Sequence, residues 1–413
     1  MCTINPFCAL RPTPEKVSEI ATHSVERYSH EQIKDILAHN PVSFLQVINP
    51  VHIPEQGAHE HLYSIKNKLH EFVSKGIFIQ DNSPCFYIYR QIKNGRHHVG
   101  IIGLASVDDY NNNTIKIHEQ TLAQREEKLK EYLDVCEFNA EPICLTYPHN
   151  KVLNGIMLEK AKDIPTYDYT IDEIRHTLWV VKKLEEIEQI QSQFKNIPSI
   201  YIADGHHRAA SSARLAEMRR TSNPNHTGKE LYNFFTAALF ADDELTIFSY
   251  NRLVQNLNEH SVDSFLTELK KTFKVTLLTE KVKEPAHKNL LSIYTNKQWY
   301  SIDIGNLPRP HTNDAAQNLD VSVLSDFILS PILGIKDIRN DKRISFIPAI
   351  KSSVEIEQIV DSGKIAAAFC LYPVSFEELI SVANSGKEMP PKSTWIEPKL
   401  ESGLLIYSFG KIF

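Results

Sequence analysis

Five residues of types that can bind a ligand or take part in a reaction are consecutive in the chain, namely Asp204, Gly205, His206, His207 and Arg208. The residues before them, 199–203, are apolar or β-favouring, whereas residues 209–215 have the Ala, Arg and Leu content of a helix. The segment therefore predicts a strand, a tight turn and a helix. The first-turn N–H groups of a helix have no partner within it, and the helix dipole adds partial positive charge there. Anions, phosphate above all, bind such places.

Phosphate binding would give a role to four residues of this Asp-Gly-His-His-Arg box (residues 204–208), which are Gly205, His206, His207 and Arg208. Gly205 allows a positive φ or a close approach of the backbone, and the two histidines and Arg208 supply side-chain donors. Cations are disfavoured in the first turn of a helix, so crowding them there indicates a compensating anion. An ordinary turn with an N-cap also explains Asp-Gly before a helix. Zinc is not indicated, because paired histidine ligands on a helix are spaced i, i+4.

A second group of reactive side chains lies at His118, Glu119 and Thr121, at the start of a charged helix expected to reach about Cys136. A histidine, a carboxylate and a hydroxyl within four residues can form an acid–base and anchoring cluster. Capping explains the same residues, because the dipole stabilises a glutamate near a helix start without any chemistry.

A third group lies in the proline-rich segment 389–400. Three prolines and Trp395 fix the path of this loop, which suits it to presenting donors to a ligand. Lys392, Ser393 and Thr394 therefore form a possible substrate loop. Packing between domains is the alternative role for this segment.

The elements that position these groups alternate irregularly, which predicts an α+β fold with mixed sheets and several domains. A Ser29–Gln32 capping box predicts a helix start, and Asn94-Gly95 predicts a hairpin turn. Strands are expected at residues 43–48, 86–91, 99–107 and 232–240. Near the acidic turn 242–244 we place the boundary between an N-terminal domain, residues 1–241, which carries the box, and a C-terminal α+β domain, residues 242–413.

Composition narrows the functional classes. The 413 residues are 42% hydrophobic with a net charge of −6 and no long basic run, which argues against a nucleic-acid binder and leaves a small anionic ligand as the expected partner. No apolar run approaches the roughly 18 residues of a membrane span, and no leader pattern opens the sequence. Six cysteines without a C-x-x-C pattern fit reduced thiols, so we expect a cytoplasmic protein. The sequence leaves the oligomeric state open.

Several segments together resemble the DUF1015 family. They are Gly103–Tyr110, Ile117–Thr121, Ile202–Arg208, Tyr250–Leu253 and Met389–Leu400. The Asp-Gly-His-His-Arg box also resembles the phosphate-binding box of the ParB and free-serine-kinase superfamily, in which such a turn opens a helix at the phosphoryl donor. The chain departs from the family pattern at Ser24–Arg27, where Pro-Tyr-Asp-Val is usual, and at Arg125–Leu129, where Lys-Glu-x-Asp-Arg is common.

The resemblance implies a small-molecule kinase that acts on free L-serine or a similar hydroxyl compound, with ATP, ADP or pyrophosphate as donor and Mg²⁺ as counter-ion. Residues Gly205–Arg208 would then cradle phosphate, Asp204 would hold the metal or the hydroxyl, and Glu119 would be the base with His118 assisting. The alternative is a ParB-like nucleotide- or anion-binding regulator without turnover. The absence of a Walker motif fits either function.

Overall fold

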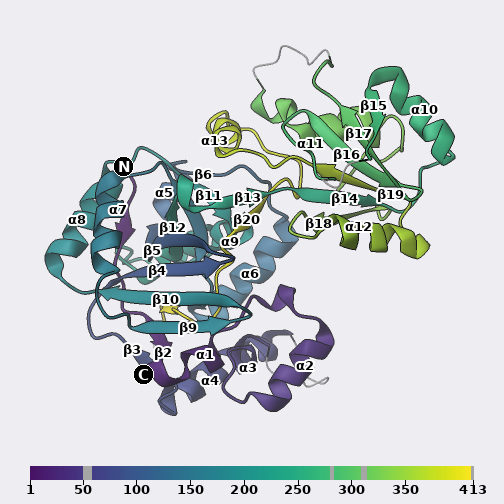
Figure 1. Ribbon diagram of the computed structural model, residues 1–413. Coiled ribbons are helices and arrows are strands. Elements are labelled where there is room, and N and C mark those ends of the chain that lie inside the picture. Colours follow the sequence, from purple (N-terminus) through teal and green to yellow (C-terminus); the bar gives the residue numbers. More distant parts are fainter. Residues whose placement is uncertain (50–57, 280–282, 308–313, 411–413) are drawn as a thin grey trace. The chain divides into compact units, whose positions relative to one another are not determined.

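The computed structural model describes residues 1–49, 58–279, 283–307 and 314–410, and it divides into two compact units (Figure 1). Unit 1 comprises Met1–Lys116, Thr121–Leu245 and Pro398–Phe413; unit 2 comprises Ile117–Gln120 and Thr246–Glu397. These units differ from the proposed segments 1–241 and 242–413, because residues 117–120 join unit 2 and residues after Glu397 return to unit 1. Whether the proposed segments are separate domains stays a prediction.

Unit 1 is built on a large mixed sheet. Its strands are β1 (Ile4–Asn5), β4 (Phe86–Lys93), β5 (Arg96–Ser106), β6 (Ile115–Lys116), β8 (Ile143–Tyr147), β9 (Tyr167–Ile171), β10 (Ile174–Val181), β11 (Ile200–Asp204) and β12 (Phe234–Ala241). They run in the order β6-β11-β8-β12-β5-β4-β10-β9, with β1 against β5. The pairs β11–β6 and β12–β8 are parallel and the others antiparallel.

Unit 1 also contains helices, some of which cover this sheet. They are α1 (Val17–Ile20), α2 (His30–His39), α3 (Leu45–Ile48), α4 (Ala58–Ser74), α5 (Val107–Asn111), α6 (Ala123–Cys136), α7 (Lys151–Lys160), α8 (Leu184–Lys195) and α9 (His206–Ser222). Helices α7, α8 and α9 bury Leu153, Ile190 and Ala213 in one apolar core with the sheet. Alanines at helical spacing on α9 let its backbone lie close to the strands, which fixes the start of this helix relative to β11.

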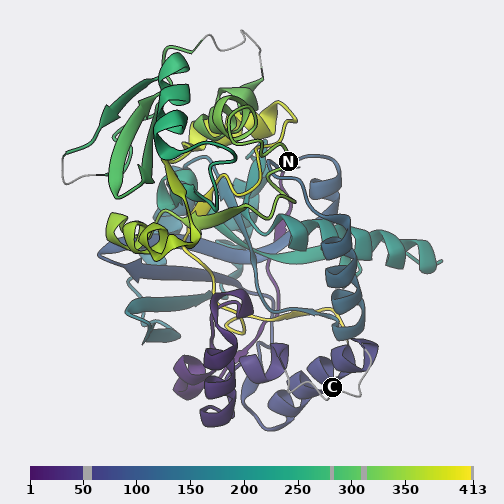
Figure 2. The ribbon, with the colours of Figure 1, turned by 90° about the vertical axis from the view of Figure 1, so that its right-hand side faces the viewer.

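The C-terminal segment completes unit 1. Two short ribbons flank the main sheet, β2 (Leu10–Pro12) with β3 (Phe78–Gln80), and β7 (Phe138–Asn139) with β21 (Tyr407–Ser408). Bridges join Leu10 to Ile406 and Thr22 to Ser402. Ile406 is also buried in a second core with α3 and α4. Figure 2 shows this yellow segment running among the purple N-terminal elements.

Unit 2 contains an antiparallel sheet in the order β15-β17-β16-β19-β14-β18. Its strands are β14 (Tyr250–Val254), β15 (Lys274–Leu277), β16 (Leu290–Thr295), β17 (Gln298–Asp303), β18 (Ile344–Pro348) and β19 (Ala367–Leu371), and β13 (Thr246–Phe248) pairs separately with β20 (Trp395–Glu397). The helices are α10 (Val262–Thr272), α11 (Asp320–Leu324), α12 (Ser353–Ile359) and α13 (Phe376–Asn384). Leu253 packs in a core with Ile356 of α12, whereas Phe369 meets Phe265 of α10 on the other face.

The structure confirms the mixed α+β fold class, the Ser29 capping box and the hairpin at Asn94-Gly95. The strand predicted at residues 43–48 is wrong, because Leu45–Ile48 forms α3. Phe44 and Val47, three residues apart, are both buried in the core shared with α4, so tertiary packing selects the helical spacing over the alternating one. In the described parts of the chain, no helix has the length and apolar character needed to cross a bilayer. All six cysteines are free thiols.

Candidate functional site

The Asp-Gly-His-His-Arg box forms the predicted strand, turn and helix. Strand β11 ends at Asp204, and α9 begins at His206 after Gly205, whose φ is 102°. A register shift between Ile202 and Asp204 interrupts the pairing of β11 with β8 just before the turn. Bulges of this kind redirect a side chain at the end of a strand. Gly205 offers no side-chain cap to α9. The start of a helix directs its first-turn N–H groups and the positive end of its dipole outward, which is the general geometry of anion sites.

Gly205 is required by its surroundings as well as by its conformation. A Cβ atom at this position would lie 3.0 Å from both Nε and Nη2 of Arg208. The positive φ is costly for any L-residue with a side chain. The turn and the position of the Arg208 guanidinium are therefore linked.

His206 is a buried and neutral member of the box. It is 6% exposed, and burial, aided by His207, lowers the pKa of His206 to about 3. At neutral pH this side chain adds no positive charge to the start of α9. The neutral form suits a position where the dipole disfavours cations.

Arg208 is compensated by carboxylates of its own unit. Its Nη1 lies 2.8 Å from Glu141 Oε2, and its Nη2 lies 3.5 Å from Asp204 Oδ2. Nη1 also donates to the carbonyl of Pro142 at 3.2 Å. The box therefore needs no anion to offset crowded cations, because His206 is neutral and Arg208 has carboxylate partners.

Asp204 also faces Lys399, which arrives from the C-terminal segment. Lys399 Nζ lies 3.5 Å from Asp204 Oδ1, and the Lys399 carbonyl accepts from Gln91 Nε2 at 3.1 Å. Nearby, buried Glu401 lies 2.8 Å from His23 Nδ1. Burial lowers the pKa of His23, but Glu401 and Asp172 outweigh it and the net shift is upward. These contacts anchor the segment that brings Lys399 to the box.

A cavity of about 270 Å³ lies against Arg208 within unit 1. Its apolar wall includes Leu129, Tyr132, Leu133 and Ile143, and its polar groups are Ser24, Asn139, Glu141, Arg208, Ser212, Thr236 and Ser402. Small-molecule sites usually combine an apolar wall with a few polar groups in this way, in volumes that start at about 300 Å³.

Thr236 gives this cavity a polar group in need of a partner. The residue is 1% exposed, and its Oγ1 has no hydrogen-bond partner among the described residues. Its N–H donates to Asn139 Oδ1 at 3.2 Å, which orients that amide beside it. A buried hydroxyl without a partner costs free energy unless a ligand or water satisfies it.

The acid–base candidates from the sequence, His118 and Glu119, belong to unit 2. His118 is 1% exposed, and its carbonyl accepts from the N–H of Met389 at 2.9 Å. The roles of Glu119 as base and of His118 as its assistant stay predictions.

The possible substrate loop also lies in unit 2. Lys392 has a φ of 56°, and its ammonium lies 5.4 Å from the centre of the Tyr250 ring. Ser393 is buried and donates to the carbonyl of Pro390 at 2.6 Å. Thr394 is partly buried, so Lys392 is the exposed member of the three.

A magnesium site is poorly matched by these residues. Over the described part of the chain, no group of three or more His, Cys, Asp or Glu side chains is arranged to hold a metal ion. Asp204, the proposed ligand, already faces the cations Arg208 and Lys399, which oppose a metal at the same carboxylate.

Comparison with known proteins identifies the family. The model of a family described as "Protein of unknown function (DUF1015)" matches residues 4–322. The chain belongs to this family. No curated protein matches the sequence.

Some solved structures are similar in part. SbnI with a C-terminal truncation from Staphylococcus aureus is 13% identical, covers 72% of this chain and 82% of its own, and has a TM-score of 0.37. A free serine kinase in complex with AMP is 13% identical over 73% of this chain and 90% of its own, with a TM-score of 0.36. A conserved hypothetical protein from Pyrococcus furiosus is 13% identical over 78% of this chain and 99% of its own, with a TM-score of 0.35.

Several groups around the box were not predicted from the sequence, namely Glu141, Asn139, Thr236 and Ser402. Asn139 and Glu141 precede the buried strand β8, and Thr236 is the polar exception in the apolar strand β12. A polar residue within an apolar strand was a signal available in the sequence. The partnership of Glu141 with Arg208 had no local signal.

Proposed function

We propose that this protein is a phosphotransferase that moves a phosphoryl group from a nucleotide or pyrophosphate to the hydroxyl of free L-serine or a similar small compound. The observation that carries the proposal is the junction of the Gly205 turn with the 270 Å³ cavity, because Arg208 belongs to both. A phosphate at the start of α9 would place the rest of its molecule within reach of a small-molecule cavity.

The residues around the junction supply the binding part of the reaction. The first turn of α9 and Arg208 would hold the donor phosphate, with Gly205 permitting close approach. Asp204 would orient the acceptor hydroxyl, since its carboxylate lies between the cations Arg208 and Lys399 at the start of α9. Thr236 and Asn139 would hydrogen-bond to polar atoms of the ligand inside the cavity.

In this proposal the phosphoryl group passes directly from the donor to the acceptor, without a covalent intermediate on the protein. The acceptor oxygen forms a bond to the terminal phosphorus of the donor, the bridging P–O bond breaks, and the hydroxyl proton passes to a base. Glu119 is the base in this proposal. Mg²⁺ as counter-ion of the donor is not supported by a protein site among the described residues and is assigned no step.

Incubation of the full-length protein with L-serine, Mg²⁺ and one donor at a time, followed by ³¹P NMR, tests the proposal. We expect phosphoserine with one of ATP, ADP or pyrophosphate. Arg208→Gln should suppress it. Arg214→Gln is the matched control, since Arg214 lies on the same helix and pairs with Glu126 and Glu127. Absence of phosphorylated product with every donor and a panel of hydroxyl compounds would rule out the kinase.

The second candidate is a ParB-like nucleotide- or anion-binding regulator without turnover. It is favoured by one observation, that the binding groups of the box and cavity all belong to unit 1 whereas the proposed base belongs to unit 2. Saturable nucleotide binding that depends on Arg208, without product from any acceptor, would select this function.

A further inference from the structure

Arg252 is a fully buried cation in unit 2. It lies in the inner strand β14, opposite Phe346 of β18 and Phe369 of β19, and it is 1% exposed. Its neighbour Leu253 faces the α12 core, so Arg252 projects from the opposite face of the sheet. Its guanidinium lies 5.4 Å from the centre of the Phe346 ring.

The partners of Arg252 are neutral. Nη1 donates to the carbonyl of Tyr250, and Nη2 donates to the carbonyl of Pro391 at 3.4 Å. Within the ranges that the structure describes, no carboxylate forms an ion pair with Arg252, and Nε has no hydrogen-bond partner. Burial lowers the pKa of Arg252 to about 9, so the group is still charged at neutral pH. An isolated buried charge is costly unless an anion compensates it.

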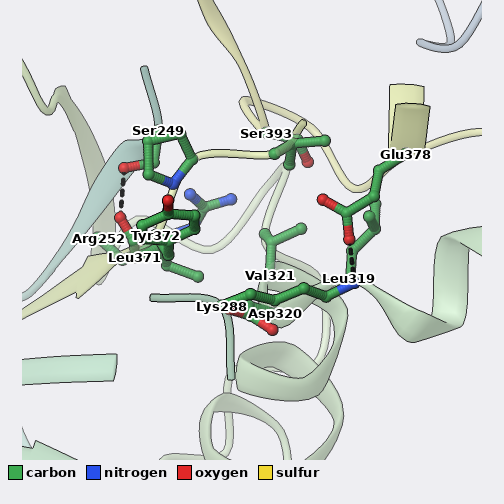
Figure 3. A pocket seen from close by; sticks show the side chains of 12 residues that line it. Ser249, Arg252, Lys288, Leu319, Asp320, Val321, Leu371, Tyr372, Glu378 and Ser393 are labelled. Atoms are coloured by element: carbon green, nitrogen blue, oxygen red, sulfur yellow. Dashed lines mark hydrogen bonds and ion pairs between the residues drawn. The ribbon is translucent and has the colours of Figure 1, made fainter. Parts of the chain in front are cut away.

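A small pocket lies beside this cation. Arg252, Ser249 and Ser393 line one part of it, and Lys288, Asp320 and Glu378 line another (Figure 3). Its volume is about 10 Å³, close to what one water-sized atom needs. A phosphate group is too large for such a space, whereas a halide or one oxygen of a carboxylate matches it.

The carboxylates of the pocket already have donors. Glu378 pairs with Lys288 and accepts from the N–H of Ser375 at 3.0 Å, and Asp320 accepts from the N–H of Asn289 at 2.8 Å. The negative charge of these carboxylates therefore lowers the affinity of the pocket for an anion. Neither carboxylate takes the place of the anion as the partner of Arg252.

We propose that Arg252 forms a binding site in unit 2 for one compact anion, either a small inorganic ion such as chloride or the carboxylate of a small organic acid. The anion accepts a hydrogen bond from Nε and compensates the buried guanidinium. The site is separate from the Asp-Gly-His-His-Arg box of unit 1 and does not depend on the proposed kinase activity.

A first experiment locates the anion in the wild-type protein. Crystals of the full chain soaked in bromide should show an anomalous peak within hydrogen-bond distance of Arg252 Nε. A water at that position, with bromide bound elsewhere, would overturn the proposal. This test does not depend on the folding of any variant.

A second experiment measures binding in solution by the ³⁵Cl NMR linewidth. Arg252→Met should remove a saturable part of the chloride broadening that wild type shows. Arg343→Met is the matched control and should keep it, because Arg343 has its own carboxylate, Asp341, 2.7 Å away. Equal broadening in wild type and Arg252→Met would refute the site.

Acetate then distinguishes the two sources. If acetate displaces chloride at a concentration lower than that of the chloride, a carboxylate is the preferred ligand. If displacement requires an excess of acetate over chloride, the inorganic ion is preferred. Binding should also lower the apparent unfolding equilibrium constant of unit 2 by about ten-fold at about ten times the dissociation constant. The same anion concentration should leave Arg252→Met unchanged relative to a matched ionic strength.

Discussion

The neutral His206 at the start of α9 makes the stability of unit 1 depend on pH in a way that one residue controls. Its folded pKa of about 3 lies below the ordinary value of 6.5, so the unfolded chain takes up a proton that the folded chain refuses. The stabilisation is complete above pH 6.5 and is lost as the pH falls from 6.5 toward 3.

The magnitude at pH 5 hardly depends on the precise folded pKa. At this pH, which is about 1.5 units below its ordinary pKa, a histidine in the unfolded chain is almost fully protonated. Because each pH unit below the pKa contributes about 1.36 kcal/mol, this protonation favours unfolding by about 2 kcal/mol. Between pH 7.5 and pH 5 the free energy of unfolding of His206→Asn should therefore fall by about 2 kcal/mol less than that of the wild type. Other titrating groups cancel in this difference.

Urea unfolding of unit 1 measures the effect. Trp299→Phe with Trp395→Phe leaves Trp179, a unit 1 residue, as the only tryptophan and thus the fluorescent reporter. His226→Asn is a matched control, since His226 lies at the surface of the same unit. Equal losses of stability in wild type and His206→Asn would refute the argument, because His206 would then be charged in the folded state.

Four further predictions concern the proposed reaction. Arg208→Lys should weaken donor binding by about ten-fold or more in calorimetry, because the planar fork is lost while charge is kept; unchanged affinity would remove Arg208 from the cradle. Gly205→Ala should lower the free energy of unfolding by about 1 kcal/mol or more and weaken donor binding, and normal values of both would show that the turn tolerates a side chain. Glu119→Gln should lower kcat by roughly 10²–10⁴-fold with a modest change in KM, and near-full activity would mean that another group is the base. Asp204→Asn should slow turnover at an unchanged Mg²⁺ requirement, because Asp204 orients the acceptor hydroxyl in the proposal, whereas an altered Mg²⁺ requirement would assign it to the metal.

Sequence patterns of short range determined the local structure around the box. An apolar run, an Asp-Gly turn and an alanine-rich stretch predicted β11, Gly205 and α9, because each depends on residues only a few positions apart. The hairpin at Asn94-Gly95 was predictable for the same reason. The alternating segment 43–48 misled the prediction, since its apolar side chains fit a helix once α4 packs against them.

Only the tertiary structure decided which groups surround the box. Lys399 meets Asp204 and Glu141 meets Arg208 through contacts between residues far apart in the chain, which no local periodicity encodes. The charge of His206 was likewise decided by burial. From the sequence alone a histidine has an ordinary pKa, but in the packed interior water cannot solvate the cation, and the pKa of His206 is lowered. For Arg252, the sheet and the loop at Pro391 turn an ordinary arginine into a buried cation beside a pocket, because exclusion from water is a property of the assembled fold.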